Sequence, residues 1–120
     1  MIFKMINYSK AFQVRVRNIE CLKHDLIKLI LVHLLKKKNK NTPIYTEYNP
    51  INPNESYPDI CMVKKDRIYF FEIQKELSKK WVKEVTKKYS TLSSDLIIVP
   101  LKDLPTDLNK LIKELEKYVI

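Results

Sequence analysis

Two short apolar runs, separated by a polar tetrapeptide, constrain the fold of this chain more than any other feature. The runs cover residues 60–63 and 68–73, and the tetrapeptide covers residues 64–67. Short runs rich in β-branched and aromatic residues around a polar break are typical of a β-hairpin. We therefore expect the middle of the chain to form two neighbouring antiparallel strands.

The length of the turn decides which residues face each other across this hairpin. A turn centred on Lys65 and Asp66 would set Asp59 opposite Glu72. Gln74 would then share a face with Glu72, because side chains alternate along a strand. A turn with an odd number of residues, or a bulge, would shift the pairing by one residue. The even turn predicts two carboxylates side by side on neighbouring strands.

Asp59 and Glu72 have two interpretations. They either cap strand ends in solvent or pair with nearby lysines, or they bind a divalent cation. Glu72 lies between Phe71 and Ile73, on a strand whose two faces both read as covered. A buried carboxylate is costly unless it is paired or bound to a metal. Carboxylate oxygens at this position would suit Mg²⁺ or Mn²⁺.

The spacing of these residues resembles a known nuclease motif. Pro58-Asp59, a gap, and then Glu72-Ile73-Gln74 are similar to the motif of the PD-(D/E)xK superfamily, with Gln74 where lysine is usual. The superfamily includes restriction enzymes, archaeal Holliday-junction resolvases and small viral nucleases, and some members carry glutamine at the lysine position. The resemblance implies that Asp59 and Glu72 bind Mg²⁺ or Mn²⁺. It implies that Gln74 orients the attacking water or completes the metal shell.

Further acidic residues are candidates for the same site. The resemblance implies an acidic residue on the first helix that faces the metal, and Glu20 is the best candidate, with a solvated Glu20 as the alternative. Glu47 is a second possible acidic neighbour, with an ordinary surface glutamate as its alternative. His24 and His33 lack metal partners at a useful spacing, so both are expected to be packed or surface histidines.

The periodicity of the rest of the chain predicts a single α/β domain. The expected elements are a helix over 18–38, a strand over 44–48, the hairpin, a helix from Ser78 to about Leu92, a strand over 95–100, and a helix from near Pro105. The first helix is expected to have an apolar stripe formed by Ile19, Leu22, Leu26, Leu29, Ile30 and His33. The superfamily core has this αβββαβ order, here followed by one more helix. The resemblance therefore covers about residues 18–120 and implies a restriction-endonuclease-like mixed sheet flanked by helices, with residues 1–17 as an N-terminal extension. The strand–helix–strand unit predicts a parallel pair.

The charge of the chain is unevenly distributed. Residues 1–90 contain 19 basic and 9 acidic residues, whereas residues 91–120 contain 4 and 5, within a net charge of +9. Regional positive charge is typical of nucleic-acid binding, although a lysine-rich composition would give the same charge without a partner. Lys79, Lys83 and Lys87 recur at four-residue steps after Lys75, and this stripe either follows a phosphate backbone or forms a solvated face.

Several classes of protein are excluded by composition. The chain has no glycine, which excludes P-loop and GxGxxG nucleotide motifs. Its 2 cysteines, Cys21 and Cys61, are too few for a disulfide framework and are expected to be reduced and buried. No apolar run is long enough to span a bilayer and the N-terminus lacks a signal-peptide pattern, which predicts a cytoplasmic protein without a membrane partner.

These observations together predict a metal-dependent endonuclease that acts on DNA, with branched or junction DNA as one candidate substrate, and a homodimer as its plausible form. The alternative is a nuclease-like DNA-binding module, catalytically weak or inactive, that works in replication or transfer. A third interpretation is a partner-binding protein unrelated to nucleic acid.

Overall fold

The computed structural model of the chain describes Ala11 and residues 22–120. Their helices and strands follow the order α1 (Leu22–Lys38), β1 (Ile44–Thr46), β2 (Ile60–Lys64), β3 (Arg67–Gln74), α2 (Lys79–Tyr89), β4 (Ser94–Pro100), the short 3₁₀ helix η3 (Leu101–Asp103), α3 (Leu108–Leu115) and the 3₁₀ helix η4 (Glu116–Tyr118). The expected sequence of helix, three strands, helix, strand and helix is present in this part of the chain.

The four strands form one mixed sheet in the order β1-β2-β3-β4. β1 and β3 both pair antiparallel with β2, and β4 pairs parallel with β3. The parallel pair is the one that the strand–helix–strand pattern predicts, because α2 returns the chain to the end of the sheet at which β3 began. An α/β class with a mixed sheet and flanking helices is therefore confirmed.

The β2–β3 hairpin has the even turn. Its pairing runs from Lys64↔Arg67 to Ile60↔Phe71, so the next position of the same register sets Asp59 beside Glu72. Lys65 occupies the left-handed region of the backbone, with φ of 55°, which lets a two-residue turn close without glycine. The register predicted from the polar tetrapeptide is confirmed.

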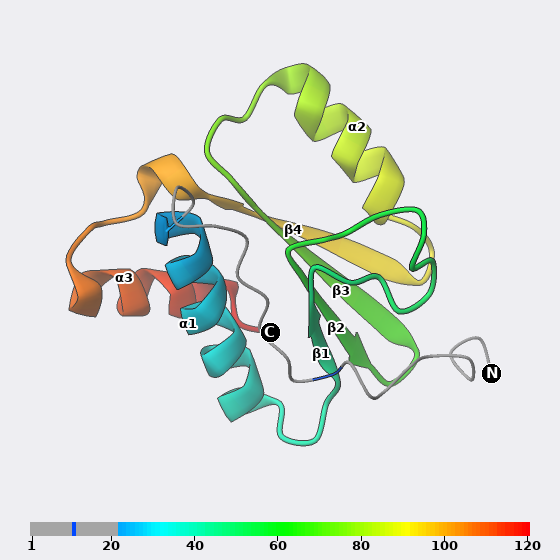
Figure 1. Cartoon of the computed structure of the whole chain (residues 1–120), viewed down its shortest axis with the longest axis horizontal. Helices are drawn as coiled ribbons and strands as arrows, with labels where there is room; N and C mark the ends of the chain where they lie inside the picture. Colours follow the sequence, from blue (N-terminus) through cyan, green and yellow to red (C-terminus); the bar gives the residue numbers. More distant parts are fainter. Residues whose placement is uncertain (1–10, 12–21) are drawn as a thin grey trace.

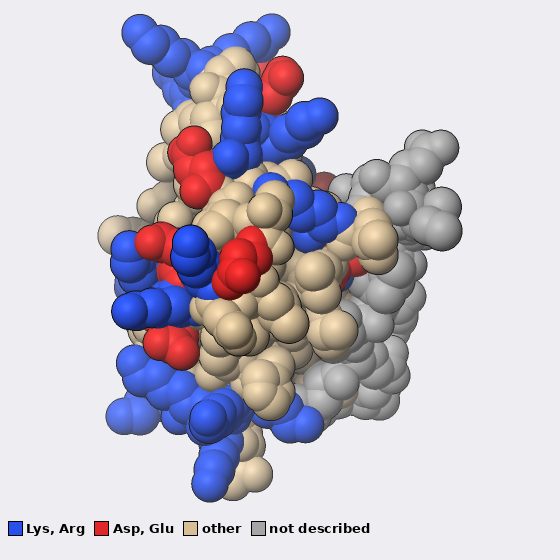
Figure 2. All heavy atoms as spheres, turned by 90° about the vertical axis from the view of Figure 1, so that its left-hand side faces the viewer, with Lys and Arg blue, Asp and Glu red and all other residues tan. Residues whose placement is uncertain are grey.

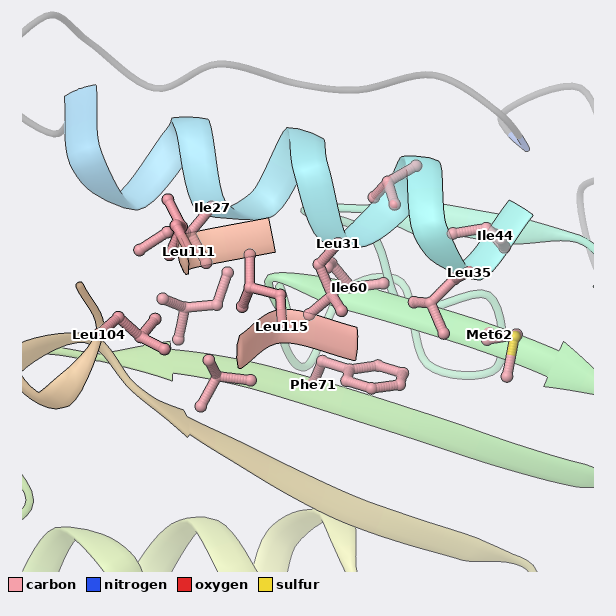
Figure 3. Packing of buried hydrophobic residues seen from close by; sticks show 13 residues of the cluster. Ile27, Leu31, Leu35, Ile44, Ile60, Met62, Phe71, Leu104, Leu111 and Leu115 are labelled. Carbon is pink, nitrogen blue, oxygen red and sulfur yellow. The ribbon is translucent and has the colours of Figure 1, made fainter. Parts of the chain in front are cut away.

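Helices cover both faces of the sheet (Figure 1). Side chains from α1 and α3 pack on one face, against inward residues of β2 and β3 such as Ile60, Met62 and Phe71 (Figure 3). On the other face, Val85 and Tyr89 of α2 pack against a second cluster that includes Cys61, Val63, Ile68 and Phe70. The alternation along β2 and β3 thus supplies one set of residues to each layer, and the sheet is the shared wall of both cores.

The buried face of α1 differs from the expected stripe. Ile27, Leu31 and Leu35 are fully buried, whereas Leu22 and Leu29 are 66% and 51% exposed. Leu26 and His33 are also exposed, Ile30 is partly buried and packs against the core, and Ile19 lies outside the described residues. The expectation was wrong because α1 carries apolar residues on both sides, so helical spacing alone does not select the side that meets the sheet and α3.

Several element ends also differ from the expected ones. β1 ends at Thr46 rather than residue 48, because Glu47 turns into the left-handed region with φ of 52°. α2 ends at Tyr89 rather than Leu92, which is fully exposed. α3 begins at Leu108 rather than near Pro105, because the Asp107 side chain accepts a hydrogen bond from Lys110 N and caps the helix there. Among the described residues, no helix is long and apolar enough to cross a membrane.

Candidate functional site

The candidate site lies at the edge of the sheet where the parallel strands end. Gln74 and Pro100, the last residues of β3 and β4, pair with each other at this edge, and Asp59 directly precedes the first residue of β2. The first turn of α1 also arrives here, because His24 contacts Asp59. Ligand sites in α/β sheets commonly lie outside the carboxyl ends of the strands.

The loop that leads into Asp59 is ordered by one asparagine. The Asn49 side-chain oxygen accepts hydrogen bonds from the backbone N–H groups of Ile51 and Asn52, at 3.0 and 3.1 Å. Its amide nitrogen donates to Ser56 Oγ at 2.9 Å. Asparagine commonly organises turns through such local hydrogen bonds. The buried Asn49 thereby holds residues 49–56 and sets the path of Tyr57 and Asp59.

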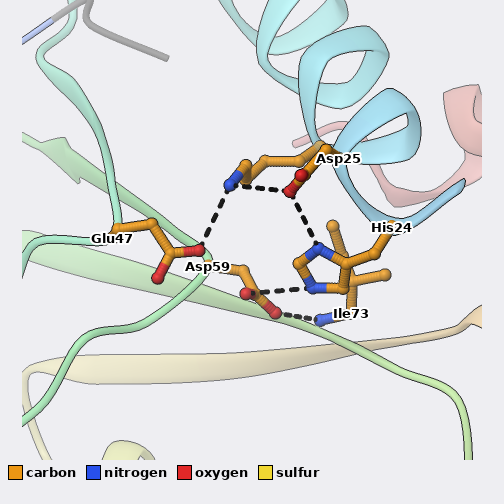
Figure 4. Close-up of polar contacts among 6 residues, drawn as sticks. His24, Asp25, Glu47, Asp59 and Ile73 are labelled. Atoms are coloured by element: carbon orange, nitrogen blue, oxygen red, sulfur yellow. Dashed lines mark hydrogen bonds and ion pairs between the residues drawn. The ribbon is translucent and has the colours of Figure 1, made fainter. Parts of the chain in front are cut away.

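Asp59 is held by two elements at once. Its Oδ2 accepts a 2.7 Å hydrogen bond from Ile73 N of β3, and its Oδ1 lies 3.1 Å from His24 Nε2 of α1 (Figure 4). The side chain is 1% exposed. The backbone continues the β1–β2 ladder, because the Asp59 carbonyl accepts from Glu47 N at 3.3 Å. Asp59 therefore fastens α1, β1 and β3 to the start of β2.

The contact with His24 belongs to a largely buried charge network, whose members among the described residues include His24, Asp25, Lys28, Glu47 and Asp59. His24 Nδ1 lies 3.4 Å from Asp25 Oδ1. Lys28 Nζ lies 3.3 Å from the same oxygen and 3.2 Å from Glu47 Oε1. Only a protonated imidazole donates hydrogen bonds at both ring nitrogens. The network places the carboxylates of Asp25, Glu47 and Asp59 around the Lys28 ammonium and the His24 imidazole.

Lys28 is the centre of this network and is 0% exposed. A buried ammonium is costly unless carboxylates pair with it. Its pairs, Asp25 and Glu47, come from the same helix and from the residue after β1. α1 is therefore attached to the sheet by charge at its first turns and by apolar packing further along.

Glu72 has different neighbours from Asp59. By alternation Glu72 shares the α2 side of the sheet with Phe70, and it lines a cleft of about 410 Å³ between residues 55–57, β3 and α2. Burial raises the pKa of Tyr89 in this cleft, and the charges of Glu72 and Asp59 raise it further. Both carboxylates thus lie within electrostatic range of the Tyr89 hydroxyl, although Asp59 does not line the cleft. We call this feature the α2 cleft.

The other predicted site residues are distributed around this edge. Gln74 is half-buried at the end of β3, Lys75 follows it in solvent, and the stripe Lys79, Lys83 and Lys87 is exposed along α2. Figure 2 shows basic side chains gathered where α2 lies, at the top of the view, with acidic ones among them. The stripe lies on the opposite side of α2 from the buried Val85 and Tyr89. Glu20 lies outside the described residues.

Sequence reasoning missed His24, Asp25 and Lys28. His24 was expected to be a packed or surface histidine, and it instead contacts the predicted site residue Asp59. Glu47, a predicted acidic neighbour, joins the same network through Lys28. One signal was present, since Lys28 interrupts the most apolar run of the chain, and a lysine inside such a run requires a buried partner.

Comparisons of the chain with protein-family models, with curated proteins and with solved structures each find no match.

Proposed function

We propose that this chain is a metal-dependent nuclease that hydrolyses phosphodiester bonds in DNA. One observation carries the proposal: the hairpin register from Lys64↔Arg67 to Ile60↔Phe71 sets Asp59 beside Glu72, at the sheet edge where α1 brings further charged groups. Like charges at directly opposed positions of neighbouring strands repel each other. A shared cation would convert that repulsion into binding energy.

The donor set fits Mg²⁺ or Mn²⁺. Asp59 and Glu72 would supply hard carboxylate oxygens, and Mg²⁺ is commonly held by one or two carboxylates together with waters and substrate phosphates. Ile73 N donates to Asp59 Oδ2 and His24 Nε2 lies 3.1 Å from Oδ1, so a cation bound by Asp59 would share the carboxylate with these groups. Among the described residues no group of three or more His, Cys, Asp and Glu gathers as a metal site, so water and phosphate would complete the shell.

Each residue of the proposed site would then have a distinct role. A bound divalent cation would polarise the phosphodiester and lower the pKa of a water molecule. Ile73 N–H and His24 hold the Asp59 carboxylate in place, and Glu72 presents its carboxylate to the α2 cleft. Gln74 would orient the water through its side-chain amide, and Lys75 with the α2 stripe would bind phosphates. A homodimer would extend this small footprint on branched or junction DNA.

The test is cleavage by Asp59→Asn and Glu72→Gln variants. With Mg²⁺ or Mn²⁺, each variant should lose plasmid, linear and four-way-junction cleavage by more than the roughly 10–100-fold that loss of an outer partner of a metal site costs. DNA binding should survive, chelator should abolish wild-type cleavage, and the exposed Asp66→Asn should behave as wild type. Circular dichroism checks that Asp59→Asn is folded. Cleavage that persists in both variants would remove the site assignment.

A second candidate function has its own observation. Both Asp59 oxygens are engaged by protein groups and the side chain is almost fully buried, which suits a structural carboxylate in a nuclease-like DNA-binding module. Gln74 in place of lysine suits the same alternative. A wild-type protein that binds DNA but cleaves nothing with any divalent metal would favour this second function.

A further inference from the structure

The α2 cleft has a second wall that the proposed chemistry does not use. Its volume of about 410 Å³ lies within the roughly 300–1,000 Å³ of small-ligand sites. Three aromatic side chains line it: Tyr57 from the loop before Asp59, and Trp81 and Tyr89 from α2. Tyr89 is buried and packs on Phe70 of β3, with ring centroids 4.6 Å apart. Tyr57 is 64% exposed, so its ring is available to a ligand.

The charges inside the cleft favour a ligand that donates hydrogen bonds. Among the described residues that line it, Glu55, Glu72 and Glu84 are acidic and Lys88 is the one cation. Lys88 Nζ lies 5.4 Å from the centroid of the Tyr89 ring. Carboxylates accept hydrogen bonds and repel phosphate. A flat neutral group that carries N–H donors therefore suits the interior better than an anion.

The helix that forms one wall of the cleft is basic on its outer side. Helix α2 carries five lysines and one glutamate in the sequence KKWVKEVTKKY. Lys88 lines the cleft, whereas the stripe of Lys79, Lys83 and Lys87 faces away from it. A basic peptide would match the acidic interior but would be repelled by this helix and by the net charge of +9. A DNA strand matches both regions, because its phosphates suit the lysines and its bases are neutral aromatic groups with donors.

We propose that the α2 cleft binds an unpaired nucleobase with an exocyclic amino group, stacked on Tyr57 and Trp81 with its amino group directed to the cleft carboxylates. The proposal rests on the proposed function in that DNA is the partner, and it narrows the substrate class to DNA with unpaired nucleotides beside the scissile phosphate. A base within a duplex is stacked and paired, so it does not enter a cleft between a loop and a helix.

The single tryptophan of the chain makes this proposal directly measurable. Trp81 is the only tryptophan and it lines the cleft, so its fluorescence reports occupancy. The full chain is titrated in chelator with a dC 12-mer, a dT 12-mer and a duplex of the same length. The dC strand should quench Trp81 and bind about tenfold more tightly than dT, which lacks the amino donor. The duplex should leave the fluorescence nearly unchanged.

Two variants separate the cleft from the rest of the surface. Tyr57→Ala should weaken binding of the dC strand by about 5- to 100-fold, the range that loss of one aromatic stack gives. Leu92→Ala is the matched control, since Leu92 is an exposed apolar residue outside the cleft, and it should bind as wild type. Both positions are exposed, so neither change threatens folding.

The outcomes that overturn the proposal are distinct from failure of the nuclease assignment. Equal quenching by dC and dT, equal quenching by duplex, or unchanged binding by Tyr57→Ala each removes the base site. Quenching by an arginine-rich peptide as strong as that by the dC strand assigns the cleft to a basic protein partner instead. Because the titration is done in chelator, quenching without any later cleavage keeps the base site and removes only the nuclease activity.

Discussion

At the scale of single residues, the charge network at the sheet edge contains a fully buried lysine. Lys28 is fully buried, and its ammonium is compensated by Asp25 and Glu47 at 3.3 and 3.2 Å. Removing one member of a buried ion pair is strongly destabilising, because the remaining charge is left without compensation. The network around Asp59 is therefore a structural requirement whatever its catalytic role.

We predict that Lys28→Met lowers the free energy of unfolding by about 3–5 kcal/mol at neutral pH, measured by urea denaturation. Lys37→Met is the control, because Lys37 is exposed in the last turn of the same helix and should change stability by less than about 0.5 kcal/mol. A loss below about 1 kcal/mol at neutral pH would contradict the network described above.

At the scale of elements, the parallel strands β3 and β4 are joined near their N-terminal ends by a bidentate ion pair. Arg67 Nε and Nη2 donate to Asp95 Oδ2 and Oδ1, both at 2.6 Å. Hydrogen bonds from Arg67 lower the pKa of Asp95. This pair lies at the opposite end of the two strands from Gln74, so it can be tested without touching the candidate site.

The lowered pKa of Asp95 predicts that the ion pair with Arg67 contributes to stability in a pH-dependent way. The pKa of Asp95 is lower in the folded than in the unfolded state, so the ion pair stabilises the fold fully above the unfolded value of about 3.9. The contribution is lost as the pH falls through the lowered folded-state pKa. Asp95→Asn should therefore lower Tm at pH 7, and its Tm should converge with that of the wild type at low pH. Asp103→Asn is the control, because Asp103 is an exposed aspartate of η3, and it should show no such convergence. A difference in Tm between Asp95→Asn and the wild type that stays constant with pH would argue against the ion pair.

At the scale of the whole molecule, the charge distribution can be tested by salt dependence. Under the proposed function, changing Lys79, Lys83 and Lys87 to Gln should weaken DNA binding and reduce the slope of log K against log salt by about 2–3, because each lost phosphate contact removes a slope of about 0.9. Filter binding or fluorescence anisotropy across a salt series measures this slope.

The matched control is the same change at the lysines of α3 and η4, Lys110, Lys113 and Lys117, which are also exposed and lie along one helix face. Both triple variants reduce the net charge from +9 by the same three charges. Equal slopes for the two variants would mean that net charge alone, and not the α2 stripe, determines binding.

Much of the architecture could be predicted from local patterns. The β2–β3 register followed from two apolar runs around the tetrapeptide 64–67, since an even turn leaves one pairing. The parallel pairing of β3 with β4 followed from the helix between them. The lysine stripe of α2 also lies opposite the buried Val85 and Tyr89, because an amphipathic helix turns its polar face to solvent.

What the sequence by itself determined was the alternation and spacing that make elements, and with them the hairpin register from Lys64↔Arg67 to Ile60↔Phe71. The tertiary structure decided which side of α1 is buried, because that helix carries apolar residues on both sides. Contact with the sheet and α3 buries Ile27, Leu31 and Leu35 and leaves Leu22 and Leu29 exposed. It also decided the partners of Asp59. His24 and Lys28 reach the sheet edge through contacts between distant segments, and the energy of such contacts depends on burial that no local pattern records.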